Sequence, residues 1–167
     1  SGTVGHDAFA FNSFRTVTRD TYDAAVLAAT GQARVDLSES WTITEGIDGS
    51  RSITTGVTTL TNIDSLDFND LVGVVPGAKL DYAYDVATAK LTGATSGQSG
   101  TVGHDAFAFN SFRTVTRDTY DAAVLAATGQ ARVDLSESWT ITEGIDGSRS
   151  ITTGFTTLTN IDALDFN

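Results

Sequence analysis

Residues 40–55 read SWTITEGIDGSRSITT, a stretch that already describes a pair of strands. Trp41 and Ile43 alternate with threonines, which is the pattern of a strand with one buried face. Asp48-Gly49 is typical of a tight hairpin turn, because its glycine accepts a positive φ without strain. The register of this hairpin predicts that Ile53, in the returning strand, shares the face of Trp41 and Ile43.

The hairpin belongs to a segment that the chain contains twice. Among the 167 residues, Ser99–Asn167 repeat Ser1–Asn69 at a distance of 98 positions with two substitutions, Val57 to Phe155 and Ser65 to Ala163. Self-similarity at a fixed period is typical of repeat proteins, in which each unit packs against its neighbours. We therefore divide the chain into a first full repeat (1–98, with a core of 1–69 and a hairpin and linker of 70–98) and a second, truncated repeat (99–167).

The composition favours strands over long helices. The chain holds 27 threonines, 16 glycines and one proline, and its short apolar runs are separated by turn residues. We predict an all-β fold and, more specifically, an Ig-like β-sandwich module that recurs with the repeat. A parallel β-solenoid, similar to a β-roll, is the alternative, because threonine-rich strands also suit stacked rungs.

Four segments outside the hairpin carry further expectations. Phe9 and Phe11 alternate near the start of the chain and predict a strand whose aromatic rings lie in the core. Ala24–Ala29 has helical propensity but is short, so a helical turn and a buried strand both stay open. We expect Leu71–Val75 to be extended and Gly93–Gly100 (GATSGQSG) to be a flexible linker.

The charge of the chain limits its partners. Lys and Arg number 10 against 21 Asp and Glu, which gives a formal net charge of −11. An acidic surface repels phosphate backbones and anionic lipids but suits divalent cations, so we expect no nucleic-acid partner. No apolar run approaches the roughly 18 residues of a transmembrane helix, so we expect no membrane insertion. The absence of cysteine excludes disulfides and thiolate metal sites.

A short glycine-containing motif near the start of each repeat indicates calcium. GTVGHDAFA at residues 2–10 matches the calcium-binding nonapeptide at four of its five defined positions, with Thr3 in place of the second glycine. In that motif the glycines expose carbonyl oxygens and the aspartate supplies a carboxylate. Asp7 and its repeat Asp105 are therefore candidate calcium ligands. A turn that leads into a strand explains the same residues without a metal.

Acidic residues also recur at every third position near the end of the repeated segment. In an extended or looped segment these carboxylates can converge on one calcium ion, particularly at a junction between repeats. A solvated edge without a ligand is the alternative. The candidates are Asp64, Asp67, Asp70, Asp162 and Asp165.

Three runs of the chain resemble a known class of secreted bacterial proteins. They are GHDAFAF at 5–11, ARVDLS at 33–38 and TTLTNID at 58–64. These runs are similar to segments that flank nonapeptide blocks in type I secreted, RTX-like (repeats-in-toxin) proteins, including giant repetitive adhesins. The resemblance implies export to the bacterial cell surface, calcium-rich surroundings and a role as a repetitive extension or adhesion module. The chain lacks the tandem nonapeptides of that class.

The residues point to no catalytic centre. Ser, His and Asp are present, but no nucleophile elbow or comparable frame arranges them for catalysis. We therefore expect a non-enzymatic spacer or adhesion repeat of a secreted surface protein. Its expected partners are the neighbouring repeats, with surface glycans and self-association as further options. Two alternatives stay open, a carbohydrate- or surface-binding module and a calcium-binding β-roll segment of a secreted enzyme or toxin.

Overall fold

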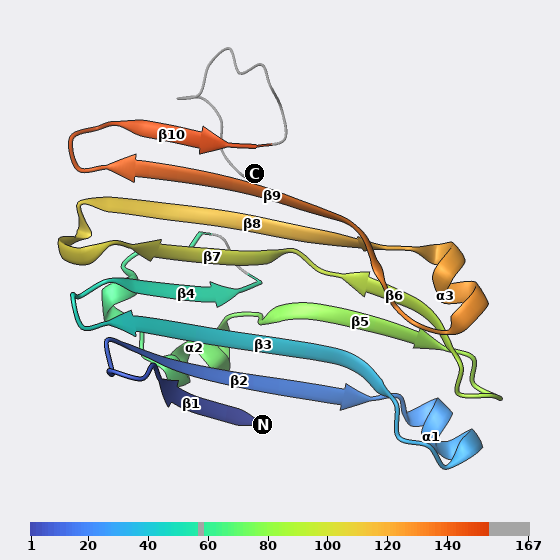
Figure 1. Ribbon diagram of the computed structural model, residues 1–167. Coiled ribbons are helices and arrows are strands. Elements are labelled where there is room, and N and C mark those ends of the chain that lie inside the picture. The colour runs from blue at the N-terminus through green and yellow to red at the C-terminus, as the bar shows by residue number, and fades with distance from the viewer. Residues whose placement is uncertain (57–58, 154–167) are drawn as a thin grey trace.

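The computed structural model describes residues 1–56 and 59–153, and its main feature is an open antiparallel β-sheet (Figure 1). Ten strands of the described residues belong to this sheet, so the predicted all-β class is confirmed. Short helices lie at one end of the strands and over one face. In chain order the elements are β1 (Gly2–His6), β2 (Asn12–Tyr22), α1 (Ala24–Thr30), β3 (Val35–Gly46), β4 (Arg51–Thr55), η1 (Ile63–Ser65), α2 (Phe68–Val74), β5 (Ala78–Tyr84), β6 (Leu91–Ser96), β7 (Ser99–His104), η2 (Ala106–Ala108), β8 (Asn110–Tyr120), α3 (Ala122–Thr128), β9 (Val133–Gly144) and β10 (Arg149–Thr152).

The strands follow one another across the sheet in the order β1-β2-β3-β4-β7-β8-β9-β10. The long strand β3 pairs with β2 on one side and has two partners on the other. Its residues 42–45 pair with β4, and its residues 37–40 pair with β5, which continues into β6 as a hairpin. All the described strands pair antiparallel, so they do not form the parallel solenoid considered above.

One face of the sheet carries the core of the first repeat. Trp41, Ile43 and Ile53 are at most 4 % exposed, and Ile43 stands opposite Ile53 in the ladder, as predicted. Phe68 and Leu71 of α2 pack onto these side chains. The arrangement is sandwich-like, with the sheet as one layer and η1, α2 and their loops as the layer over this core.

Polar contacts hold the largest core residue in place. The indole Nε1 of Trp41 donates a hydrogen bond to the carbonyl oxygen of Val75 at 2.7 Å, as a buried indole N–H requires. The guanidinium of Arg19 lies over the indole, 5.1 Å from the ring centroid. Arg19 in turn pairs with Glu39, whose carboxylate is 2.6 Å away. Trp41 is thereby hydrogen-bonded to the end of the covering segment (residues 59–75, which include η1 and α2) and packed against Arg19 of strand β2.

Local signals in the sequence define the turns and short helices. The Asp48-Gly49 turn joins β3 to β4 as predicted, with Gly49 at φ +83° and the Asp48 carboxylate accepting a bond from the Ser50 N–H at 2.9 Å. The open alternatives for residues 24–29 are resolved in favour of a helix. The Asp23 side chain caps the N-terminus of α1, and Gly31, at φ +72°, ends it.

Two predictions in the single-copy segment are wrong. Residues 71–75, expected to be extended, belong mostly to α2, because the Asp67 carboxylate caps a helix there. Gly93–Gly100, expected to be a flexible linker, runs through β6 and β7. Small residues serve close contact between strands here, since a Cβ added to Gly93 would lie 3.1 Å from the Cβ of Ala83. Glycine and serine content alone does not distinguish this use from a linker.

Truncation of Trp41 and of its repeat Trp139 is a matched test of this core. Trp41 is 1 % exposed, whereas Trp139 is half-buried. We expect Trp41→Ala to lower the free energy of unfolding by about 3–5 kcal/mol, the usual cost of truncating a buried aromatic residue, and Trp139→Ala to cost less than half of that. Urea unfolding of both variants measures the difference. Equal losses would contradict the core described above.

Candidate functional site: the junction between the repeats

The two repeats meet by pairing strands. β4, in the first repeat, pairs antiparallel with β7, the first strand of the second repeat, over five residue pairs. The ladder sets Thr54 opposite Thr101, and the two hydroxyl oxygens lie 2.9 Å apart. The sheet therefore continues through the junction without a linker. The same threonine contact, at 3.0 Å, occurs within each repeat at Thr16–Thr42 and at Thr114–Thr140.

The first strand of each repeat has one sequence and two environments. SGTVGHD occurs at residues 1–7 and again at 99–105. β1 ends the strand order with β2 beside it, whereas β7 lies between β4 and β8. Val4 of β1 is 76 % exposed, but the equivalent Val102 is 3 % exposed and joins the core cluster that contains Trp41. The second repeat thus contributes a core residue to the first.

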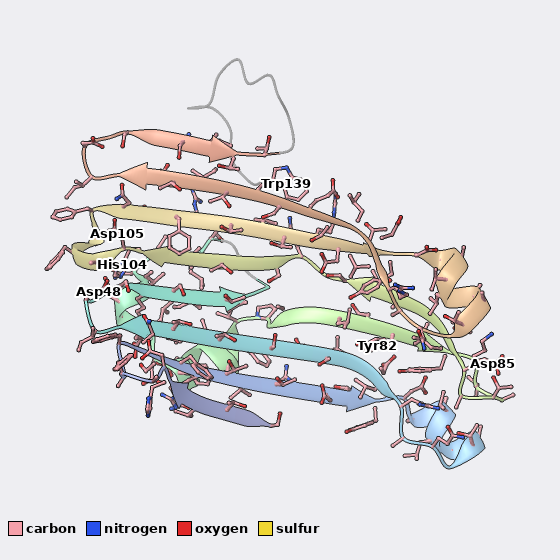
Figure 2. The ribbon with its side chains drawn as sticks, viewed as in Figure 1. Asp48, Tyr82, Asp85, His104, Asp105 and Trp139 are labelled. Carbon is pink, nitrogen blue, oxygen red and sulfur yellow. The ribbon has the colours of Figure 1, made fainter. Side chains whose placement is uncertain are left out.

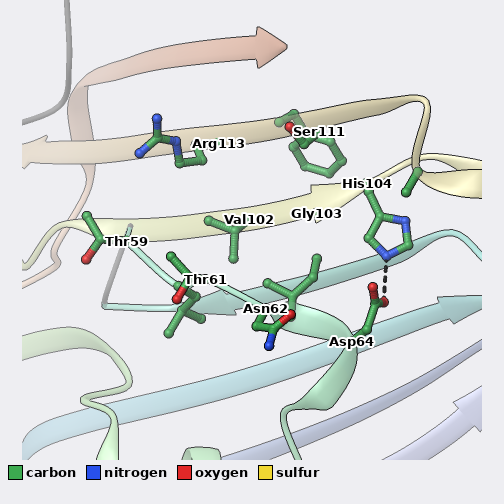
Figure 3. Close-up of a pocket in the computed structure, with 13 residues that line it drawn as sticks. Thr59, Thr61, Asn62, Asp64, Val102, Gly103, His104, Ser111 and Arg113 are labelled. Atoms are coloured by element: carbon green, nitrogen blue, oxygen red, sulfur yellow. Dashed lines mark hydrogen bonds and ion pairs between the residues drawn. The ribbon is translucent and has the colours of Figure 1, made fainter. Parts of the chain in front are cut away.

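His104 makes a side-chain contact across the junction (Figure 3). Its Nε2 lies 2.8 Å from Oδ1 of Asp64, which belongs to η1 of the first repeat, and its Nδ1 lies 2.8 Å from the carbonyl oxygen of Asp105. The bond to that carbonyl raises the pKa of His104 above its ordinary 6.5; burial opposes the rise, and Asp64 adds to it. The positively charged imidazole is thereby favoured at the junction.

Arg51 of β4 holds the covering segment against the junction. Its guanidinium donates to the carbonyl oxygen of Ile63 and, at 2.9 Å, to that of Leu66. Its Nε also lies 3.3 Å from a carboxylate oxygen of Glu45 in β3. These contacts fix η1 beside the start of the second repeat, which is what brings Asp64 within reach of His104.

A groove of about 450 Å³ lies beside these contacts (Figure 3). One side of its lining comes from residues 59–64 of the first repeat, and the other comes mainly from β7 and β8 of the second. Apolar side chains such as Leu60 and Phe112 line it together with polar ones such as Asn62. Both repeats therefore contribute to the lining of this groove.

The single-copy hairpin β5–β6 also reaches the second repeat. β6 packs beside β8 and α3. The Nζ of Lys90, next to β6, donates to the carbonyl oxygen of Ala126 in the last turn of α3 at 3.2 Å. Carbonyl groups at a helix C-terminus lack partners within the helix, and a lysine is well suited to satisfy one. The hairpin thus contacts the second repeat near α3, at the end of the strands opposite to His104 (Figures 1 and 2).

Asp7 and Asp105, two of the calcium candidates, lie in the loops that join the first two strands of each repeat. The Asp7 carboxylate accepts hydrogen bonds from three backbone N–H groups within the next five residues, at 2.8–3.3 Å. Asp105 accepts from the backbone and side chain of Asn110 at 2.9 and 2.6 Å, and these bonds lower the pKa of Asp105 below its ordinary value. Both carboxylates therefore stabilise a turn that leads into a strand, which is the alternative to a calcium site given above.

The other calcium candidates do not gather in the described part of the chain. Asp64 bonds to His104, Asp67 caps α2 and Asp70 lies in the first turn of that helix. Within residues 1–56 and 59–153, no group of three or more His, Cys, Asp or Glu side chains is arranged to hold a metal ion. The acidic side chains described therefore do not fit the oxygen-rich set that calcium takes. Asp162 and Asp165 lie outside the described residues, and calcium binding stays a prediction.

Sequence reasoning missed an apolar row at the hairpin tips. Phe9 and Phe11, predicted to be core residues of a strand, lie in the β1–β2 loop and are 77 % and 54 % exposed. Their rings stack with the centroids 5.7 Å apart. Ile47, in the neighbouring β3–β4 turn, is 76 % exposed, and its N–H donates to the carbonyl oxygen of Phe11 at 2.7 Å. The hairpin tips at this end of the strands therefore present three exposed apolar side chains per repeat.

The second repeat presents the same apolar side chains at the same end of the strands, the end where Asp48 and Asp105 lie in Figure 2. The prediction failed because the bonds from Asp7 close a tight loop, so that the alternation of Phe9 and Phe11 has no strand to follow. The aspartate before the aromatic pair and Asn12 after it were the available signal, since Asp side chains close turns. In the second repeat, the exposed side chains equivalent to Phe9, Phe11 and Ile47 are Phe107, Phe109 and Ile145.

Comparison with protein-family models, with curated proteins and with solved structures finds no match for this chain. None of the helices in the described residues is both long and apolar enough to cross a membrane. The geometry of the junction therefore carries the functional interpretation.

Replacement of His104 tests the side-chain contact across the junction. Because the pKa of His104 is raised in the folded chain, its stabilising effect is fully present below pH 6.5 and is lost as the pH rises through the raised pKa. We expect His104→Asn to lower the free energy of unfolding by about 0.5–1 kcal/mol at about pH 6 and by less at about pH 8, the modest size being that of a partly exposed ion pair. Denaturant titrations at the two pH values measure this.

His6→Asn is the matched control, because His6 occupies the same position in β1 and contacts the carbonyl oxygen of Asp7 at 2.7 Å. This variant keeps the contact between His104 and Asp64, so the stabilisation that this contact gives at about pH 6 should persist in it. If both variants change the pH dependence equally, the contact between His104 and Asp64 does not join the repeats.

Proposed function

We propose that this chain is a spacer and adhesion repeat of a secreted bacterial cell-surface protein, in which successive repeats join into one continuous sheet. The pairing of β4 with β7 is the observation that carries the proposal. A repeat whose neighbour supplies both its next strand and the core residue Val102 is built to be followed by another copy. The near-identity of the two copies supports this interpretation, because a spacer gains reach with every copy.

The strand order gives the proposed array a defined length per repeat. Each period adds four strands to the main path of the sheet, β1–β4 in the first repeat and β7–β10 in the second. Since neighbouring strands lie about 4.8 Å apart, one period advances the array by about 19 Å. Strand pairing takes the place of a linker at each junction, so the array stays in register as it grows.

The apolar row supports the adhesion part of the proposal. Phe9, Phe11 and Ile47 recur with each repeat at the same end of the strands. The exposed aromatic pairs are therefore spaced by the distance that one period adds to the array. Large exposed apolar side chains in a row are suited to contact with a surface. Repetition raises avidity even when each contact is weak. The same row favours a surface- or carbohydrate-binding module as the second candidate function, since aromatic rings also stack on sugars.

The acidic composition fits a long exported array. With a net charge of −11 in 167 residues, neighbouring arrays repel one another and stay soluble. The proposed partners are therefore the adjacent repeats and a target surface reached by the hairpin tips.

Chains lengthened by whole periods of 98 residues test the proposal. In solution X-ray scattering of chains that are already longer across the strands than along them, we expect each further period to increase the maximum dimension by about 19 Å, because it adds four paired strands. Separate compact domains of this size would each add their own diameter, about 34 Å. An increment near that larger value would contradict a continuous sheet and would favour domains connected end to end.

A further inference from the structure

The hairpin tips combine exposed aromatic rings with negative charge. A tip consists of the loop between the first two strands of a repeat and the adjacent Asp-Gly turn, which are residues 7–12 with 46–50 and residues 105–110 with 144–148. Each tip contains two aspartates and no lysine, arginine or histidine. We infer that the tips bind a lipid surface that exposes choline headgroups, with the paired aromatic rings in contact with the quaternary ammonium groups.

The aromatic pair of each tip is held outward in a fixed arrangement. The rings of Phe107 and Phe109 lie 5.9 Å apart, and the equivalent rings of the first repeat lie 5.7 Å apart. Hydrogen bonds within each loop and to the adjacent turn set this arrangement, including the bond from the Ile145 N–H to the carbonyl oxygen of Phe109 at 2.8 Å. The tips therefore present the rings to a partner without first having to order a flexible loop.

The charge of the tips decides which lipid fits. Anionic headgroups repel the two aspartates of each tip, whereas phosphatidylcholine carries a quaternary ammonium group at its outer surface. Hydrogen bonds from the side chain and the N–H of Ser50 lower the pKa of Asp48 below its ordinary value, so this carboxylate keeps its charge in mildly acidic solution. A quaternary ammonium group is attracted both to carboxylates and to the faces of aromatic rings. The rings and the charges of the tip therefore favour the same headgroup.

A sugar fits the same tip less well. Specific recognition of a sugar needs free polar groups beside the aromatic ring to pair with its hydroxyls. The Asp7 carboxylate instead accepts hydrogen bonds from three backbone N–H groups of its own loop and, at 3.0 Å, from the side-chain amide of Asn12, and phenylalanine side chains have no polar atom. Attraction between opposite charges acts over several ångströms and does not require a free lone pair. A choline headgroup is therefore better matched to the tip than a hydroxyl-rich ligand.

The two tips of the chain are placed to contact one flat surface together. Both lie at the same end of the strands, where Asp48 and Asp105 appear in Figure 2. They are one period apart, about 19 Å at the usual spacing of neighbouring strands, and the ladder between β4 and β7 keeps them in line. Two linked contacts bind more tightly than either alone. The inference rests on the proposed function in taking the hairpin tips as the contact surface, and the contact is peripheral, with the rings at the level of the headgroups.

Co-sedimentation of the full chain with lipid vesicles tests the inference. At physiological ionic strength we expect phosphatidylcholine vesicles to bind the chain at least about tenfold more tightly than phosphatidylglycerol vesicles with the same acyl chains, since each charge near an anionic surface changes the affinity by roughly fivefold. Phe9→Ser/Phe11→Ser should weaken binding to phosphatidylcholine by about tenfold or more, because one of two linked contacts is lost. Adding Phe107→Ser/Phe109→Ser to that variant should abolish binding.

Two further variants separate the roles of position and charge. Val86→Ser removes another exposed apolar side chain, next to Asp85, which Figure 2 shows at the opposite end of the strands, so binding should not change. Asp48→Asn/Asp146→Asn removes one charge per tip while Asn-Gly still suits the turn. Phosphatidylcholine should bind this variant less tightly, and phosphatidylglycerol should bind it more tightly. Circular dichroism should report an unchanged fold for every variant, because the replaced side chains are exposed.

The outcomes separate this inference from the proposed function. If phosphatidylcholine vesicles do not bind the chain, bind the variant without the four phenylalanines equally well, or bind no better than phosphatidylglycerol vesicles, the inference is overturned. If the chain instead adheres to a polysaccharide-coated surface through the same phenylalanines, choline recognition is wrong and the adhesion proposal stands. If the replacements change adhesion to neither surface, contact through the tips fails, and with it both this inference and the adhesion part of the proposed function.

Discussion

The antiparallel ladder between β4 and β7 is the contact on which the rest of the structure depends. Backbone N–H and C=O groups of a buried strand need partners on both sides, and β4 obtains its second set from the following repeat. The same ladder carries Val102 into the core of the first repeat. It also places His104 beside η1, which Arg51 holds against the sheet. Without the ladder, the core would lose Val102, the groove would lose its lining from β7, and His104 would not reach Asp64.

Near-identical segments in different surroundings separate what sequence decides from what neighbours decide. The strand pattern, the Asp-Gly turn and the capped helix recur in both copies, because each depends on residues close in sequence. Burial does not recur. Leu27 of α1 is 45 % exposed, whereas the equivalent Leu125 of α3 is 5 % exposed where β6 packs on that helix. Leu37 is half-buried beside β5, whereas Leu135 is 51 % exposed. Neighbouring repeats therefore determine how complete each core is.

The sequence predicted the local features and missed those made by distant segments. Alternation of Trp41 and Ile43 with threonines predicted their shared face with Ile53, because the turn between them spans a few residues. Pairing of strands across repeats had no local signal, since glycines at the start of β7 suggest a linker as readily as close packing. Asp64 was a candidate for its charge, but its contact with His104 depends on strand order. Phe9 and Phe11 were misplaced because hydrogen bonds to one carboxylate outweigh two residues of alternation.

Amide hydrogen exchange, measured by NMR at monomeric concentrations, tests the continuous sheet most directly. Residues 2–6 and 100–104 have the same sequence, so their intrinsic exchange rates are equal and any difference reports their surroundings. The amides of β7 that point towards β4 should be protected, while the equivalent amides of β1 should exchange nearly as fast as in an unfolded chain. Equal protection of the two strands would contradict the pairing of the repeats.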